Sequence, residues 1–248
     1  MELRRFRADL HIHSCLSPCG ELRMSPRRII EQALQAGLDI VAVSDHNSAE
    51  NAAAAVRAAR GTPIRVFPGM EITSEEEVHI LGVFGSISRA LRVEETVYRN
   101  LPGIPGKTKF TEDQVIADER DIVSGFCPRF LMGATSLSIY QVLDLIHDNG
   151  GLAIASHVDR DSFSVISQLG FIPPNLEIDA LEVSPNMASS EAQARLGLDP
   201  ALPVVSFSDA HQPDEIGLRS TAFLLARPTI GEIRKALRGR SQRRVMPS

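Results

Sequence analysis

The stretch that indicates the fold most clearly is IVAVSDHN, at residues 40–47. Its first four residues form a continuous apolar run, which is typical of a strand buried on both faces of a sheet. Polar residues follow at once, among them Asp45 and His46. Because the carboxyl ends of parallel strands converge on one crevice, this pattern predicts a functional site at that end of the sheet.

Similar apolar runs recur along the chain and alternate with helical patterns. The candidate strands are Ala8–His13, Ile40–Ser44, Arg65–Met70, Val78–Phe84, Leu152–Ser156, Ala180–Ser184 and Val204–Ser208. Candidate helices follow Ser25-Pro26, Asn47 or Ser48, Ser138, and Thr229, each of which can cap a helix. The alternation predicts an α/β fold with parallel strands, wound into a barrel or an open sheet.

The alternation of strands and helices is interrupted at residues 101–136, which begin LPGIPGKTKF and have no helical period. Within them, Gln114–Asp118 and Asp121–Phe126 predict a hairpin. A connection this long is usually functional or disordered. We therefore expect one domain, residues 1–248, with an insertion at about 101–136 near the mouth of the barrel, either a lid or a surface excursion.

The composition is that of an ordinary globular protein, with 43% hydrophobic and 23% charged residues. A net charge of −5 does not favour a nucleic-acid binder. No apolar run approaches the roughly 18–20 residues of a membrane helix, and the start turns polar too early for a signal peptide. Three cysteines do not make a disulfide framework. These features favour a cytoplasmic enzyme.

The seven histidines are not spread evenly. His147 lies near the end of a helical pattern, where the helix dipole suits a cation, and is expected to be structural. Glu71 and Asp209 follow candidate strands. Burying so many titratable groups together is costly unless metal ions compensate them. The other six histidines stand at or just beyond an end of a candidate strand: His11, His13, His46, His79, His157 and His211.

The spacing of these residues predicts more than one ion. In DLHIH, residues 9–13, the two-residue period of a strand places Asp9, His11 and His13 on one face. The histidines can share an ion, and Asp9 is expected to orient a ligand, as is Asp45. About eight or nine nitrogen and oxygen ligands predict two or three ions of zinc, iron or manganese. Glu71 is the natural bridge between them.

Taken in order, these residues resemble the motifs of the PHP (polymerase and histidinol phosphatase) superfamily. The resemblance implies a distorted (β/α)7 barrel with parallel strands and a trinuclear metal site at their carboxyl ends. It extends over about residues 8–211 and is carried by His11-x-His13, Ser44-Asp45-His46-Asn47, Gly69-Met70-Glu71, His79, His157 and Asp209-Ala210-His211.

The resemblance also implies how the ligands are shared. One ion would take His11, His13, Glu71 and Asp209, and a second would take Glu71, His79 and His157. A third would take His46, His211 and a residue of the loop after the first strand. The family often has histidine or aspartate there, whereas this chain has Cys19. As a ligand, Cys19 favours zinc or iron over manganese or magnesium. As a buried bystander, it would leave a two-metal enzyme.

These expectations lead to a phosphoesterase that hydrolyses its substrate by a metal-bound hydroxide, since metal ions bring the pKa of bound water toward neutrality. The expected catalytic residues are Asp209, Glu71 and His157. Arg160, three residues past His157, is expected to hold the phosphate, unless it only pairs with a neighbouring aspartate. The expected substrate is a small phosphorylated metabolite or nucleotide.

Three alternatives remain. A metal-dependent nuclease is supported locally only by the basic tail, residues 234–244. An amidohydrolase-like enzyme for C–N or C–O bonds often uses a lysine at a strand end, but the three lysines are Lys107, Lys109 and Lys235. A non-catalytic metal-binding domain is disfavoured, because open multinuclear sites suit catalysis.

Overall fold

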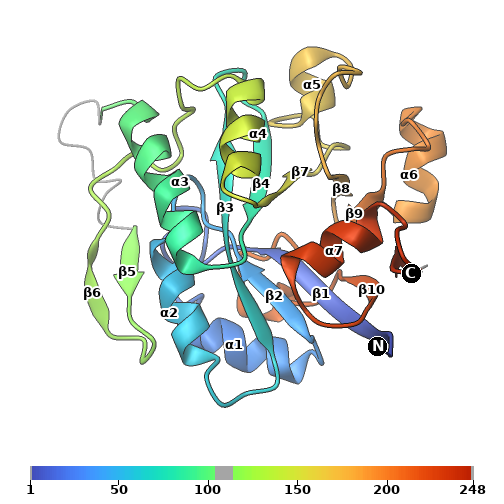
Figure 1. Ribbon diagram of the computed structural model, residues 1–248. Helices are drawn as coiled ribbons and strands as arrows, with labels where there is room; N and C mark the ends of the chain where they lie inside the picture. Colours follow the sequence, from blue (N-terminus) through green and yellow to red (C-terminus); the bar gives the residue numbers. More distant parts are fainter. Residues whose placement is uncertain (1, 104–113, 247–248) are drawn as a thin grey trace.

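Nine strands of the computed structural model form one sheet that curls into a nearly closed barrel (Figure 1). The structure describes residues 2–103 and 114–246. The strand order is β11-β10-β1-β2-β3-β4-β7-β8-β9. The strands are β1 (Arg4–Ile12), β2 (Ile40–Val43), β3 (Arg65–Thr73), β4 (His79–Val83), β7 (Leu152–Ala155), β8 (Ala180–Val183), β9 (Val204–Ser206), β10 (Thr221–Leu225) and β11 (Arg244–Val245).

The barrel closes between β1 and the segment that follows β9. The backbone amide of His13 donates to the carbonyl of Ala210 at 2.9 Å, and Ile12 forms a parallel bridge with Ala210. The pairs β1–β2, β2–β3, β7–β8 and β8–β9 are parallel. All seven predicted strands are present, and the prediction of a distorted α/β barrel is confirmed.

The expectation that every barrel strand is parallel is wrong for β4, which is antiparallel to both β3 and β7. Only a tight turn joins β3 to β4, in which the amide of Ser74 donates to the carbonyl of Val78 at 2.9 Å. A parallel pair needs a crossover of about a dozen residues or more, so this turn imposes the antiparallel direction. His79 therefore begins its strand, yet it lies at the barrel end where the parallel strands finish.

Helices cover the barrel, and the core has two main parts. One cluster packs the helices against the sheet, and a second fills the barrel with Phe6, Leu10, Phe67 and Phe207. Within the described ranges, no helix has the length and apolarity required to span a membrane. The helices are α1 (Pro26–Gln35), α2 (Glu50–Ala58), α3 (Ile87–Asn100), α4 (Ile139–Asp148), α5 (Val165–Leu169), α6 (Ser189–Leu196) and α7 (Ile230–Leu237), with a 3₁₀ turn at Pro213–Glu215.

The helix caps agree with the sequence patterns in three of the four predicted helices. Pro26 opens α1, Ser138 forms a capping box with Gln141 at α4, and the Thr229 side chain caps α7. Neither Asn47 nor Ser48 is the N-cap of α2, which starts after Ala49. Asn47 instead has a positive φ of 51°, and its amide donates to the carbonyls of residues 131 and 133. Long-range bonds to the insertion therefore override the local capping signal.

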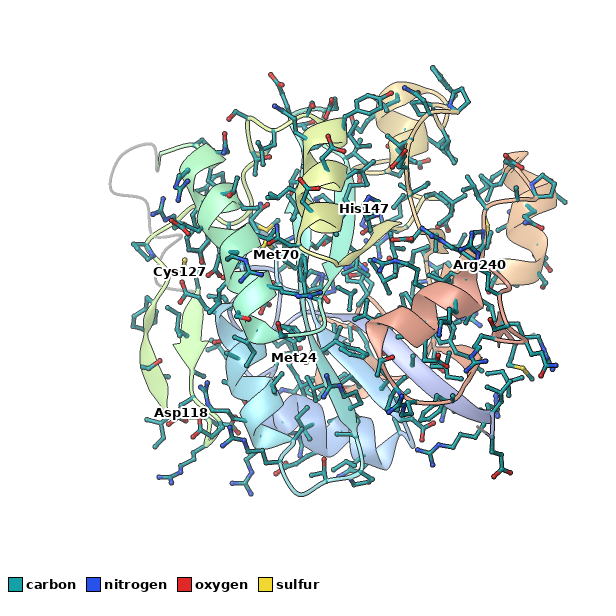
Figure 2. All side chains as sticks on the ribbon, in the orientation of Figure 1. Met24, Met70, Asp118, Cys127, His147 and Arg240 are labelled. Atoms are coloured by element: carbon teal, nitrogen blue, oxygen red, sulfur yellow. The ribbon has the colours of Figure 1, made fainter. Side chains whose placement is uncertain are left out.

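The described part of the insertion contains the predicted hairpin, β5 (Val115–Ala117) and β6 (Val123–Phe126). It stands beside α2 and α3, and Figure 2 marks Asp118 near its tip. Glu119 pairs with Arg57 of α2 at 2.8 Å, and Asp121 accepts a hydrogen bond from the amide at residue 27 of α1. These contacts hold the hairpin against helices α1 and α2 at the side of the barrel. Residues 104–113 of the insertion lie outside the described residues.

Candidate metal centre

The six strand-end histidines meet at one end of the barrel, with ring centroids of neighbouring imidazoles 4.5–6.2 Å apart. Glu71 on β3 and Asp209 after β9 lie among them and are buried. His147 stays outside the cluster: it sits at the end of α4 (Figure 2), where its Nε2 lies 3.1 Å from Asp179. The structure thus brings together every residue that was expected to bind metal and keeps His147 apart.

Glu71 occupies the centre of the cluster, with 1% of its side chain exposed. Its Oε1 lies 3.1 Å from His79 Nδ1 and 3.3 Å from Nε2 of both His11 and His157. Its Oε2 lies 3.1 Å from His46 Nδ1 and 3.5 Å from His13 Nε2. The two carboxylate oxygens therefore face different imidazoles, so that Glu71 could contact more than one ion.

Several buried polar atoms of this cluster make no hydrogen bond within the described residues. They include His11 Nε2, Glu71 Oε1, His79 Nδ1 and His157 Nδ1. Buried polar atoms almost always have a hydrogen-bond partner, so atoms without one call for an explanation. Imidazole nitrogens and a carboxylate oxygen are ligands for divalent metal ions. The residues present thus fit a metal centre.

Ligand atoms lie within 4.8 Å of one another in three overlapping sets. The sets share members, so a compact multinuclear site is geometrically accessible. They are His11–His13–Glu71, His46–Glu71–His79 and His13–Cys19–His46–His211.

Competition between burial and neighbouring charge sets the protonation of the cluster. Burial opposes the charged form of Glu71, but the charge of His79 and other imidazoles holds its pKa well below the ordinary value. Burial and the adjacent His46 lower the pKa of His13 to about 3. Burial also opposes a charge on His46, yet Cys19 and Glu71 raise its pKa to about 10. An imidazole that is held neutral, as His13 is, offers a lone pair to a metal ion.

Hydrogen bonds at the outer side of three imidazoles select the tautomer that metal binding needs. The Nδ1 of His11 lies 2.9 Å from Glu182, that of His13 lies 3.1 Å from the Ser17 hydroxyl, and that of His211 lies 2.7 Å from the carbonyl of residue 209. With the proton on Nδ1, each ring keeps a lone pair on Nε2. In His11 and His13, Nε2 faces Glu71.

The contacts that Glu182 and Ser17 make with His11 and His13 were not predicted from the sequence. Their contacts with His11 and His13 depend on how β1 lies against β8 and on the path of the loop after β1. A weak signal existed for Glu182, since the two-residue period of β8 places it on the same face as Ala180, which packs inside the barrel.

The two predicted supporting aspartates differ in outcome. Asp45 accepts hydrogen bonds of 2.7 Å from the hydroxyls of Ser14 and Ser17, so it acts on His13 through Ser17. No hydrogen bond joins the Asp9 carboxylate to an imidazole among the described residues. Its carboxylate accepts hydrogen bonds from the backbone amides of residues 208 and 217. A register shift of β1 between Asp9 and Ile12 breaks the alternation on which that expectation relied.

Cys19 is exposed as a residue, but its sulfur lies against His46 and His211. Desolvation of the sulfur raises the pKa of the thiol, and hydrogen bonds with His211 and His46 more than offset this, so that the pKa falls to about 7. A thiol of this kind is partly ionised at neutral pH, and the thiolate is the form that binds metal. Cys15 and Cys127 are buried elsewhere.

A cavity of about 190 Å³ opens over the cluster. Arg160 lines it, and its guanidinium lies 2.5 Å from Asp209 Oδ2 with 40% of the side chain exposed. The expectation that it would pair only with Asp159 or Asp161 therefore does not hold. A larger cavity, of about 470 Å³, lies between α5 and α6 and is lined mainly by apolar side chains.

Replacing Glu182 by glutamine should weaken metal binding by about tenfold to 100-fold, because the carboxylate fixes the tautomer and raises the basicity of His11. Competition with a chromophoric chelator measures the affinity. Glu177→Gln, an exposed glutamate just before β8, is the matched control. Equal affinities of the two variants would show that Glu182 does not support the ligand.

The barrel carries at one end a buried cluster of imidazoles and carboxylates that could hold metal ions. The chain belongs to the PHP domain family, whose model it matches over residues 9–148, more than half of the chain. This match confirms the family resemblance that the sequence motifs indicated.

Similar proteins extend the comparison. An uncharacterised protein of Methanocaldococcus jannaschii is 31% identical over 100 residues, which are 37% of this chain and 58% of that protein. A lesion-specific endonuclease from Pyrococcus furiosus has a TM-score of 0.77 and 20% identity, covering 98% of this chain and 58% of the endonuclease. Endonuclease Q in complex with a 27-mer duplex that carries an abasic lesion has a TM-score of 0.75 and 21% identity, covering 98% and 59%.

The chain spans less than two thirds of the length of each of these three proteins. At 20–21% identity, the two solved structures show a shared fold.

Proposed function

We propose that the protein is a phosphoesterase that hydrolyses a phosphate ester of a small metabolite or nucleotide. The observation that carries this proposal is the position of Glu71, whose two oxygens face five imidazoles in a buried cluster beneath an open cavity. Bound metal ions would supply an activated water and offset charge on the phosphoryl oxygens.

The proposed ligands are those that the family resemblance implies, and the sets of converging atoms support all of them except Asp209 and His157, which belong to none of the sets. His11, His13, Glu71 and Asp209 would hold one ion, since His13 Nε2 lies 3.1 Å from Asp209. Glu71, His79 and His157 would hold a second. The third would take His46, His211 and Cys19, a set whose ligand atoms converge together with those of His13.

Arg160 would hold the phosphate. Its guanidinium reaches Asp209 at the edge of the cluster and is partly exposed to the cavity. A guanidinium presents its donors in a planar fork that matches phosphoryl oxygens. Arg160 would therefore orient the ester above the metal ligands.

Arg160→Ala is expected to lower kcat/KM by about 100-fold, in the range seen when one donor to a developing charge is removed. Arg160→Lys should recover only part of the loss, because a lysine lacks the bidentate fork. Steady-state kinetics measure both variants. Arg195→Ala, which removes an exposed arginine of α6, is the control. Full activity of Arg160→Ala would remove Arg160 from the proposed site.

The function is tested by measuring phosphate release from sugar phosphates, nucleotides, bisphosphates and histidinol phosphate. The protein is assayed for bound metal beforehand, and an Asp209→Ala variant controls for contaminating phosphatases. We expect turnover of at least one ester by the wild-type protein alone. A metal-loaded protein that hydrolyses none of these esters, nor a phosphodiester, would contradict the proposal.

A metal-dependent nuclease is the second candidate, favoured by the likeness of the barrel to endonuclease Q across 98% of this chain. Cleavage of single-stranded or abasic duplex DNA, falling steeply with salt, would support it. The amidohydrolase-like alternative has less support. Lys235 is the one lysine in the described ranges, and it lies on α7, 3.0 Å from Glu232.

A further inference from the structure

Phe163 is an aromatic residue at the mouth of the metal centre, in the loop between β7 and α5. Its ring stacks on the imidazole of His79, with centroids 4.7 Å apart and planes inclined by 20°. Its carbonyl accepts a hydrogen bond of 2.9 Å from the amide of His79. Two separate contacts therefore hold Phe163 beside a proposed metal ligand.

The backbone of Phe163 is strained. Its φ of 56° lies in the left-handed region, which is costly for a bulky residue. Ser164 follows at once and fixes the loop, because its hydroxyl donates to the carbonyl of Arg160 at 2.8 Å and caps α5. Burial does not explain the strained position, since 37% of Phe163 is exposed.

The cavity over the cluster shows what Phe163 faces. Most of its lining consists of metal-binding candidates, Arg160 and Ser162, while Phe163 and Met132 supply apolar side chains. Met132 comes from the insertion and is 40% exposed. One face of the Phe163 ring rests on His79, and the residue lines the cavity and is partly exposed, so a ligand in the cavity can contact the ring.

We propose that Phe163 is a stacking platform for a nucleobase, and that the ester is therefore a nucleotide. This inference rests on the proposed function. An ester held by Arg160 places its organic part in the same small cavity as the ring. Aromatic side chains bind bases by stacking without needing specific hydrogen bonds, and the thioether of Met132 adds a favourable contact with aromatic rings.

A purely structural role would have Phe163 only shield His79 from water. The two roles differ in their substrate dependence. If Phe163 only shields His79 from water, its replacement should slow hydrolysis of every ester equally. If Phe163 is a stacking platform, its replacement should slow hydrolysis only of esters that carry a base.

The test compares a nucleoside 5′-monophosphate with ribose 5-phosphate, which is the same ester without its base, in protein of verified metal content. The readout is the ratio of the two kcat/KM values. We expect Phe163→Leu to lower this ratio by about tenfold and Phe163→Tyr to retain it. The control is Phe171→Leu, which replaces an exposed phenylalanine after α5 and should leave the ratio unchanged. A short single-stranded oligonucleotide distinguishes a polymer from a free nucleotide as the source of the base.

An unchanged ratio in Phe163→Leu would overturn the platform while leaving the proposed phosphoesterase intact. If the wild-type protein hydrolyses neither ester, calorimetric binding of the two esters takes the place of kinetics, and the wider screen of phosphate esters decides the proposed function separately. The platform then requires tighter binding of the nucleotide than of ribose 5-phosphate, and loss of that difference in Phe163→Leu.

Discussion

Replacing Glu71 by glutamine should lower kcat/KM by about 1000-fold or more, with loss of bound metal. Within the part of the chain that the structure describes, Glu71 is the one carboxylate whose two oxygens between them face five imidazoles of the cluster. An amide has a single acceptor oxygen and presents hydrogens from its nitrogen, so it cannot bridge two ions. Losing about 4 kcal/mol of metal-assisted stabilisation of the transition state corresponds to this factor.

Metal analysis and steady-state kinetics on the same preparation check this prediction. Glu75→Gln is the matched control, because Glu75 lies in the exposed turn after β3. Circular dichroism shows whether each variant is folded. A folded Glu71→Gln protein that keeps its metal and turns over at the wild-type rate would show that Glu71 is not the bridge.

The sequence predicted which side chains converge, because most of the candidate ligands lie next to a local signal. Apolar runs identify the strands, and a polar residue at the end of such a run is visible without knowing its neighbours, as with His46 after β2 and Asp209 after β9. Once the fold is a barrel, the strand ends converge whatever the details of packing. The positions of the ligands therefore did not depend on exact register.

Features that depend on register or direction were harder to predict. An apolar run carries no information on strand direction, so the reversal of β4 was missed, although the connection from β3 is too short for a crossover helix. Because of the register shift in β1, the side chains of Asp9 and His11 contact different parts of the structure. Glu182 reaches His11 across 171 residues of sequence. The strands β10 and β11 were also missed; they pair antiparallel at the edge beside β1.

The direction of β4 has a functional consequence. In an all-parallel barrel, the residue that opens a strand would lie at the far end from the site. Because β4 is reversed, His79 pairs with Thr73 at the end of β3 and lies 3.1 Å from Glu71. The tight turn at residues 74–78 thus places a proposed ligand and, through the carbonyl of Phe163, the proposed stacking residue on the same side of the centre.

Removing the metal ions should abolish hydrolysis and lower the melting temperature by roughly 10 °C. Ions that bind only the folded chain stabilise it by about 4 kcal/mol at 1000 times their dissociation constant. In a chain of this size, each kcal/mol shifts the melting temperature by about 2–4 °C. The large effect is expected because His11 Nε2, Glu71 Oε1 and His79 Nδ1 are buried and accept no hydrogen bond from the described residues, and bound cations would satisfy them.

Thermal unfolding and activity are measured on the same protein after dialysis against a chelator, and again after adding back zinc, iron or manganese separately. Restored activity identifies the metals that support hydrolysis, and elemental analysis gives their number. We expect three ions per chain in the wild-type protein and two in Cys19→Ala, because the thiol converges with His46 and His211. Three ions in both proteins would show that Cys19 is not a metal ligand. An unchanged melting temperature and full activity after chelation would contradict the metal centre itself.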